Sequence, residues 1–152
     1  MAESSSSSSF TTVPGPPLIG ALLRMPWEAV QRRMLAALHE RGFDDLDAAH
    51  VNVFQYPGPE GARPSELAAR LRISKQALNY LLGELERSGY LERRPDPDDL
   101  RSKRVALSPR GVSAVAVIRE AVAELEVEWA QQLGEQRFDA LRTLLRELNE
   151  PR

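Results

Sequence analysis

The chain has 152 residues, of which 42% are hydrophobic and 28% are charged, and its formal net charge is -2. This length suits one domain with a core, together with an extension that is better buried against a partner. The absence of cysteine excludes disulfides, thiolate metal sites and thiol-based oxidation sensing. No apolar run approaches the roughly 20 residues that span a bilayer, and the start of the chain lacks the features of a signal peptide. We therefore expect a cytoplasmic protein with no membrane association.

Residues 1–17, a serine tract followed by a proline-rich stretch, are too polar and too broken by proline to pack. We expect a disordered tail there. A short apolar helical turn is predicted over residues 18–24. Pro26 then suits the first turn of a helix that ends near Arg41, because proline lacks the N–H that a first turn leaves unbonded.

Residues 43–56 are predicted to form the next helix, with Asp44 and Asp45 as candidate caps. A loop rich in proline and glycine ends it. We assign residues 18–62 to N-terminal helices that contribute to dimerisation and support the lobe that follows.

Residues 63–111 indicate two short helices followed by a basic hairpin. The first helix, residues 65–71, begins at a proline and a serine, and the second, residues 74–87, begins at the good N-cap Ser74. So short a connection forces the helices to cross steeply, which leaves the first turn of the second helix facing outward. Strands are expected at residues 90–94 and 102–107, with a loop between them.

Two further helices are expected at the end of the chain, over residues 108–133 and 135–149, with Ser108 and Pro109 as the N-cap and first residue of the longer one. Their apolar faces are too wide for a small lobe to bury, so we assign residues 112–152 to dimerisation. The predicted fold is mainly α, a winged helix-turn-helix with a two-stranded antiparallel β wing and N- and C-terminal dimerisation helices.

Three segments carry a family resemblance: SELAARLRISKQAL, LERSGYLERR and DPDDLRSKRVALSPRG. On these segments the chain resembles the multiple-antibiotic-resistance regulator (MarR) family of bacterial transcription factors. The resemblance implies a homodimer whose recognition helices enter successive major grooves, while Arg101 of the wing reaches the minor groove. It also implies that Asp99, the acidic position of a D-x-R wing signature, braces Arg101. Many members have glycine where this chain has Arg72, so either Arg72 is left-handed, at about 1–2 kcal/mol, or the turn differs.

The expected contacts with double-stranded DNA lie on the second helix of this unit and on the wing, where side chains can donate to phosphates and base edges. Residues 63–111 hold 11 lysines and arginines against 7 acidic residues, whereas the rest of the chain is acidic. That distribution suits a basic surface on an acidic body, and a merely solvated surface is the alternative. The predicted contacts are Ser74, Lys75, Gln76, Asn79 and Tyr80 on the helix and Arg101, Ser102, Lys103 and Arg104 on the wing.

The resemblance further implies a small aromatic or lipophilic effector between the DNA-binding lobe and the dimerisation helices. Ordinary core packing is the alternative for each candidate, because aromatic residues at helical spacing usually pack. The candidate lining residues are Trp27, Met34, His50, Phe54 and Tyr56.

Other kinds of site find little support. His39 and His50 do not share a helical face, and hydrolase and phosphate-loop motifs are absent, so we expect no enzyme, no metal and no cofactor. We therefore predict a sequence-specific transcriptional regulator, a repressor that binds a pseudo-palindromic operator as a homodimer and is released by a small effector. The alternative is a winged-helix module that binds a protein partner, which the basic wing disfavours.

Overall fold

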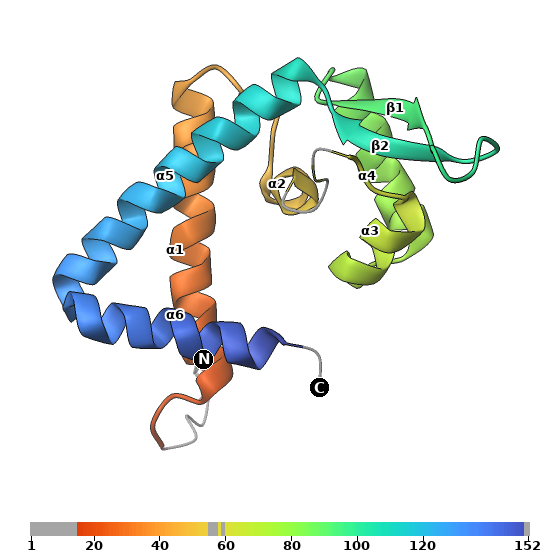
Figure 1. Ribbon diagram of the computed structural model, residues 1–152. Coiled ribbons are helices and arrows are strands. Elements are labelled where there is room, and N and C mark those ends of the chain that lie inside the picture. Colours follow the sequence, from red (N-terminus) through yellow and green to blue (C-terminus); the bar gives the residue numbers. More distant parts are fainter. Residues whose placement is uncertain (1–14, 55–57, 59, 151–152) are drawn as a thin grey trace, which may run out of the picture.

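The computed structural model describes residues 15–54, 58 and 60–150 (Figure 1). This part of the chain is mainly helical with one two-stranded antiparallel sheet, which confirms the predicted fold class. Residues 1–14 of the predicted tail lie outside the described residues. In chain order the elements are α1 (Ile19–Glu40), α2 (Ala48–Phe54), α3 (Pro64–Leu71), α4 (Lys75–Arg87), β1 (Leu91–Pro95), β2 (Lys103–Leu107), α5 (Pro109–Leu133) and α6 (Glu135–Asn149).

Helices α3 and α4 form the helix-turn-helix. The hydroxyl oxygen of Ser74 accepts a hydrogen bond from the backbone N–H of Ala77 at 3.1 Å, so α4 begins at the predicted cap. Arg72 has φ 54° and ψ 40°, in the left-handed region, which confirms the first of the two alternatives for this turn. A left-handed residue at this position lets the chain reverse within two residues. The first turn of α4 consequently lies exposed.

The wing is the hairpin of β1 and β2, paired from Leu91 opposite Leu107 to Pro95 opposite Lys103. Each strand begins one residue later than predicted. Pro95, predicted to lie in the loop, instead ends β1, because a proline is tolerated where the ladder stops and no further donor is needed. Ala62, just before α3, forms an isolated antiparallel bridge with Val105 and thereby joins the wing to the start of the helix-turn-helix.

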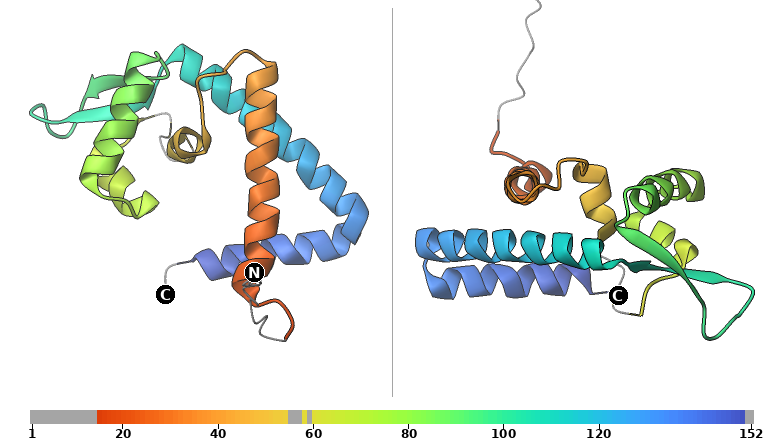
Figure 2. Two further views of the ribbon diagram at one scale, coloured as in Figure 1. Left: turned by 180° about the vertical axis from the view of Figure 1, so that it is seen from behind. Right: turned by 90° about the horizontal axis from the view of Figure 1, so that it is seen from above.

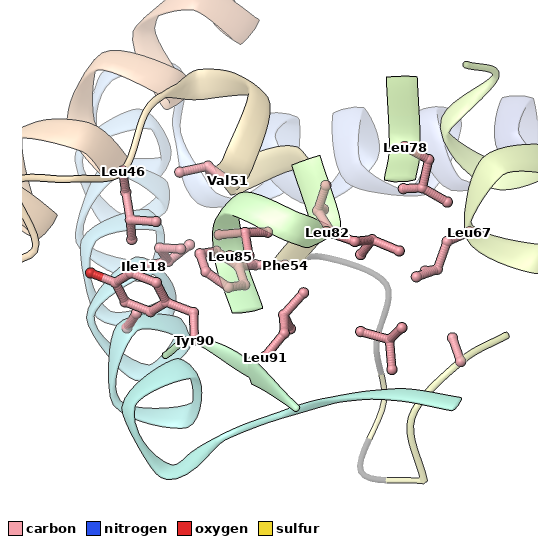
Figure 3. Packing of buried hydrophobic residues seen from close by; sticks show 14 of the residues in the cluster. Leu46, Val51, Phe54, Leu67, Leu78, Leu82, Leu85, Tyr90, Leu91 and Ile118 are labelled. Atoms are coloured by element: carbon pink, nitrogen blue, oxygen red, sulfur yellow. The ribbon is translucent and has the colours of Figure 1, made fainter. Parts of the chain in front are cut away.

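The core of the lobe lies between α2, α3, α4 and the wing (Figure 3). Tyr90, immediately before β1, is wholly buried, and its ring centroid lies 5.7 Å from that of Phe54. Burying each large apolar side chain contributes about 1.5–3 kcal/mol. The fully buried residues of this core include Leu67, Leu78, Leu82, Leu85 and Val105.

Helix α1 is one continuous helix, and the predicted break before Pro26 is wrong. The helix begins at Ile19, and Pro26 lies inside it. Proline removes a single N–H donor from a helix interior. Here the position is exposed to solvent, and α1 continues through it to pack on α5 with its second half.

Helix α2 begins later than predicted, at Ala48, so the assignment of Asp44 and Asp45 as its caps is also wrong. The side chain of Asp47 takes that role, since its Oδ1 accepts the backbone N–H of His50 at 3.0 Å. Asp45 instead accepts a hydrogen bond from the hydroxyl of Tyr90. Asp45 therefore has a partner distant in sequence, and the aspartate directly before α2 caps the helix.

Helix α5 crosses α1, and α6 folds back along α5, so that α5 lies between the other two (Figure 2). Arg33 of α1 forms an ion pair with Glu128 of α5 at 2.6 Å. Phe138 is the buried contact of α6, whereas Leu144 and Leu148 are 57% and 73% exposed. Helices α5 and α6 occur where the sequence predicts them, and α6 leaves much of its apolar face in solvent.

Candidate DNA-binding surface

The five side chains predicted to contact DNA from α4 are all exposed. Ser74, Lys75 and Gln76 occupy the first turn of α4 and its cap, where unpaired backbone N–H groups favour an anion. Asn79 and Tyr80 follow one turn later. The nearby Glu84 carboxylate raises the pKa of Tyr80, so its hydroxyl stays neutral. The face combines one positive charge with amide and hydroxyl groups able to read base edges.

The wing ends in a tight turn that carries Arg101. The backbone N–H of Ser102 donates to the carbonyl of Asp99 at 2.9 Å, which closes the turn with Leu100 and Arg101 at its corners. The Asp99 carboxylate accepts the backbone N–H of Arg101 at 3.0 Å. Asp99 thus contacts the main chain of Arg101, and the Arg101 guanidinium lies exposed without an ion pair among the described residues.

Two of the other predicted wing contacts differ in their surroundings. Lys103 is exposed. The Arg104 guanidinium lies within ion-pair distance of Asp96, at 3.2 Å, and of Asp98, at 3.1 Å, and its side chain is only 20% exposed. Arg104 is therefore engaged inside the wing. Ser102 donates from its hydroxyl to the carbonyl of Asp99 at 3.1 Å, so it also supports the turn.

Internal ion pairs remove nearly half of the positive charge that the sequence places in residues 63–111. Arg63, Arg93, Arg94, Arg104 and Arg110 each pair with a carboxylate. Six cations have no ion pair within the part of the chain that the structure describes, and they lie at the ends of α3 and α4 and at the wing. These are Arg70, Arg72, Lys75, Arg87, Arg101 and Lys103.

Comparisons with known proteins match this geometry. A sequence profile of the MarR family matches residues 54–102, from the end of α2 to the tip of the wing. YkoM of Bacillus subtilis, an uncharacterised HTH-type transcriptional regulator, is 27% identical over 85 residues, which are 56% of this chain and 54% of YkoM. The chain therefore matches about half the length of this relative.

Solved structures extend the likeness to most of the chain. CouR bound to a 23-mer DNA duplex is 26% identical, with a TM-score of 0.68 over 88% of this chain and 93% of CouR. CouR from Rhodococcus jostii bound to p-coumaroyl-CoA is 23% identical, with a TM-score of 0.69 over the same shares of both chains. Residues 54–102 of this chain thus resemble the MarR family, and its fold is similar to that of the solved CouR structures.

A hollow of about 320 Å³ lies between α1 and α5. Trp27 and Met34 line it together with Ile118. The other described candidates for an effector pocket lie inside the lobe, where Phe54 packs on Tyr90 and the ring nitrogen Nε2 of His50 lies 3.1 Å from Glu84. Tyr56, the fifth candidate, lies outside the described residues. The structure therefore separates the four described candidates into two places.

Sequence reasoning missed a junction between the winged lobe and α5. The Tyr90 hydroxyl donates to Asp45, and Arg110 donates to that hydroxyl at 3.0 Å and stacks over the ring. Burial, with the hydrogen bond to Asp45, raises the pKa of Tyr90 to about 12. The three residues belong to the segment before α2, the segment before β1 and the first turn of α5. No local pattern marks them, since Asp45 and Arg110 are 65 positions apart.

The two histidines have separate contacts, His39 with the carbonyl of Leu46 and His50 with Glu84. Within the described ranges, no group of three or more histidines and carboxylates is arranged to hold a metal ion. None of the described helices is both long and apolar enough to cross a membrane.

Proposed function

We propose that this protein is a sequence-specific DNA-binding transcriptional regulator, a repressor that acts as a homodimer on a pseudo-palindromic operator. Each recognition helix α4 enters a major groove, and the two half-sites lie about one helical turn apart. The wing turn inserts Arg101 into the neighbouring minor groove. A small aromatic or lipophilic effector releases the protein from DNA.

The observation that carries the proposal is an exposed recognition face on α4 beside Arg101 at the wing tip, which has no ion pair with any residue that the structure describes. The exposed side chains of α4 supply base-reading groups, and Arg101 and Lys103 supply charge for phosphates. CouR, which has the same fold at 26% identity, was solved with a DNA duplex. These features together support DNA as the partner over a protein that binds the wing.

The apolar faces of α1 and α6 support the homodimer. Ile19 of α1 is 70% exposed and Leu148 of α6 is 73% exposed, and both helices lie outside the winged lobe (Figure 1). Apolar surface of this kind is typical of a protein interface. A second copy that covers both helices would hold two lobes at a defined spacing, as a palindromic operator requires.

The hollow between α1 and α5 supports the effector. Trp27 and Met34 offer an apolar wall, while Arg119 and Glu126 stand at its edge. A ligand there would contact the helix that leads into the lobe. It would lower DNA affinity to the extent that it prefers the lobe spacing that does not fit the operator.

The test is selection of a duplex from a random-sequence library, followed by fluorescence anisotropy with the selected duplex and a scrambled one. Both are measured at low and near-physiological salt. We expect tight binding to the selected duplex that survives at physiological salt, with weak, salt-erased binding to the scrambled duplex. Equal affinity for both duplexes at every salt concentration would contradict the proposal, and no binding at all would favour the protein-partner alternative.

A further inference from the structure

The carboxylate of Asp96 is buried at the base of the wing, where no DNA contact is expected. Its residue is 0% exposed, and Asp96 follows directly on β1. It is the one acidic side chain among the buried polar residues that the structure describes. A buried charge is expensive unless it is paired and hydrogen-bonded, so its partners carry the argument.

Asp96 has partners in three different segments. Its Oδ2 accepts a hydrogen bond from Nε of Arg63, just before α3, at 2.5 Å. Its Oδ1 accepts the backbone N–H of Asp98 in the wing loop at 3.0 Å and lies 3.2 Å from Nε of Arg104 in β2. Nε of Arg104 is close enough for an ion pair, but its N–H is not aligned for a hydrogen bond. The Ser102 hydroxyl donates a long hydrogen bond to Oδ2 of Asp96 at 3.4 Å.

The Arg63 hydrogen bond, aided by Asp98 and Arg104, holds the pKa of Asp96 far below its usual range in spite of burial. Asp96 is therefore an anion at every pH at which the protein would bind DNA. A well-packed apolar residue usually stabilises a fold as well as a buried ion cluster does. The cluster is better explained by the geometry that it imposes than by stability.

That geometry links the wing tip to the helix-turn-helix. The backbone N–H of Asp96 donates to the carbonyl of Ser102 at 3.1 Å, and its carbonyl accepts from Asp99, so Asp96 is the base of the turn that carries Arg101. On the other side, the backbone N–H of Arg63 donates to the Glu66 carboxylate in the first turn of α3. One side-chain contact, Arg63 to Asp96, thus joins the start of α3 to the base of the wing turn.

We propose that Asp96 is a positioning residue for DNA recognition. Through Arg63 and Arg104 it sets the angle of the wing relative to α3 and α4, so that Arg101 and the first turn of α4 reach one DNA site together. The inference rests on the proposed function. It adds that a buried carboxylate, which is not itself expected to contact DNA, determines how much the wing contributes to binding.

The test is the substitution Asp96→Asn, which keeps the shape of the side chain and removes its charge. The matched control is Asp98→Asn, which makes the same charge change at a side chain that is 72% exposed and that also pairs with Arg104. Each substitution is made in the wild-type chain and in an Arg101→Ala chain. Affinity for the selected duplex is measured across a salt series, and thermal unfolding is followed for every variant.

We expect Asp96→Asn to weaken operator binding about ten-fold, because the misplaced Arg101 no longer reaches its phosphates. The salt slope, which is the slope of log affinity against log salt concentration, should become smaller in magnitude by about one. In the Arg101→Ala background the same substitution should change affinity less than about two-fold, since no wing contact is left to misplace. Asp98→Asn should have effects below about two-fold in both backgrounds.

A purely structural role gives a different pattern, namely an affinity loss of the same size in both backgrounds. That result, or wild-type affinity of Asp96→Asn, overturns the inference. If Asp96→Asn does not fold, Arg63→Lys carries the same test, because it keeps the charge and loses the planar guanidinium that holds Asp96. A wild-type chain that binds no DNA overturns both proposals, whereas wild-type binding with an indifferent Asp96 overturns this one alone.

Discussion

The winged lobe consists of α2, α3, α4 and the wing, and we call α1, α5 and α6 the helical arm. These two regions bury their apolar residues to very different extents. In the lobe, Leu67 and Leu82 are 0% exposed, and the wing, α3 and α4 close around them. In the arm, Leu144 of α6 is 57% exposed and Ile19 of α1 is 70% exposed, although both lie in regular helices. The lobe is complete within one chain, whereas the arm presents surface that a second chain would cover.

The contrast shows that the two regions should respond differently to substitution. Changes in the lobe should alter the stability of a single chain and should not depend on protein concentration. Changes on the exposed face of the arm should leave the lobe folded and alter assembly, so their effects should depend on concentration. The predictions that follow test this separation.

The largest expected effect is at Gly111, in the first turn of α5 where it meets the lobe. A Cβ atom there would overlap the carbonyl oxygen of Tyr90, which is backbone and cannot move aside. We expect Gly111→Ala to lower the free energy of unfolding by about 3 kcal/mol, as measured by urea denaturation at two protein concentrations.

Gly83 of α4 is the matched control. A Cβ at this position would lie 3.3 Å from the flexible end of Arg87, so the neighbour can shift. Because alanine is the better helix former, Gly83→Ala should raise the free energy of unfolding by about 0.5–1 kcal/mol. A Gly111→Ala protein as stable as the wild type would contradict the tight packing of the lobe against α5.

On the arm, Leu144→Glu places a charge on the exposed apolar face of α6. We expect monomers by size-exclusion chromatography with light scattering, and operator affinity about 100-fold lower, because two linked lobes bind far more tightly than one. The control Gln136→Glu adds the same charge to an exposed polar position of α6 and should leave the dimer intact. A Leu144→Glu protein that stays dimeric would show that α6 is not in the interface.

At the wing, Arg101→Ala should weaken operator binding about ten-fold and lower the salt slope by about one, with no change in unfolding temperature. The control is Arg94→Ala, which removes the same charge from an exposed arginine that already pairs with Glu92 at 2.6 Å. Anisotropy titrations at several salt concentrations give both slopes. Identical salt slopes for the two variants would show that Arg101 does not contact DNA.

The smallest effect concerns pH. Because burial raises the pKa of Tyr90 to about 12, above the value of about 10 for a free tyrosine, the neutral hydroxyl stabilises the folded state fully below pH 10. That stabilisation is lost as the pH rises from 10 through 12. We therefore expect no contribution of Tyr90 to pH dependence between pH 6 and 9, and a tyrosinate absorbance step near pH 12 that Tyr90→Phe removes. A Tyr90 step near pH 10 would contradict its burial against Asp45.

The elements that the sequence predicted correctly are those with local signals. Ser74 caps α4 and Ser108 caps α5 through bonds to residues three positions away, so the signal and the structure lie in the same short segment. The apolar period of α4 likewise depends only on its own residues. The helix-turn-helix and the wing could therefore be predicted, and their family profile matches the same stretch.

Several errors and omissions share a physical cause, which is competition from partners distant in sequence. Asp45 looks like a helix cap and instead binds Tyr90. Arg104 stays a predicted DNA contact, but no local pattern indicates its ion pair with Asp96. Period and capping rules do not contain these partners, so only the folded chain reveals them. Pro26 is a separate case, because it looks like a helix start and yet lies at an exposed position inside a continuous helix.

Helix α5 has a mechanical consequence because of its length. Its 25 residues form a rod of about 37 Å with α6 at one end and the junction of Tyr90 and Arg110 at the other. Tilting such a rod by about 5° about its α6 end moves its lobe end by about 3 Å, close to the rise of one base-pair step. A small tilt of α5 at its α6 end is thus enough to displace the winged lobe by about one base-pair step.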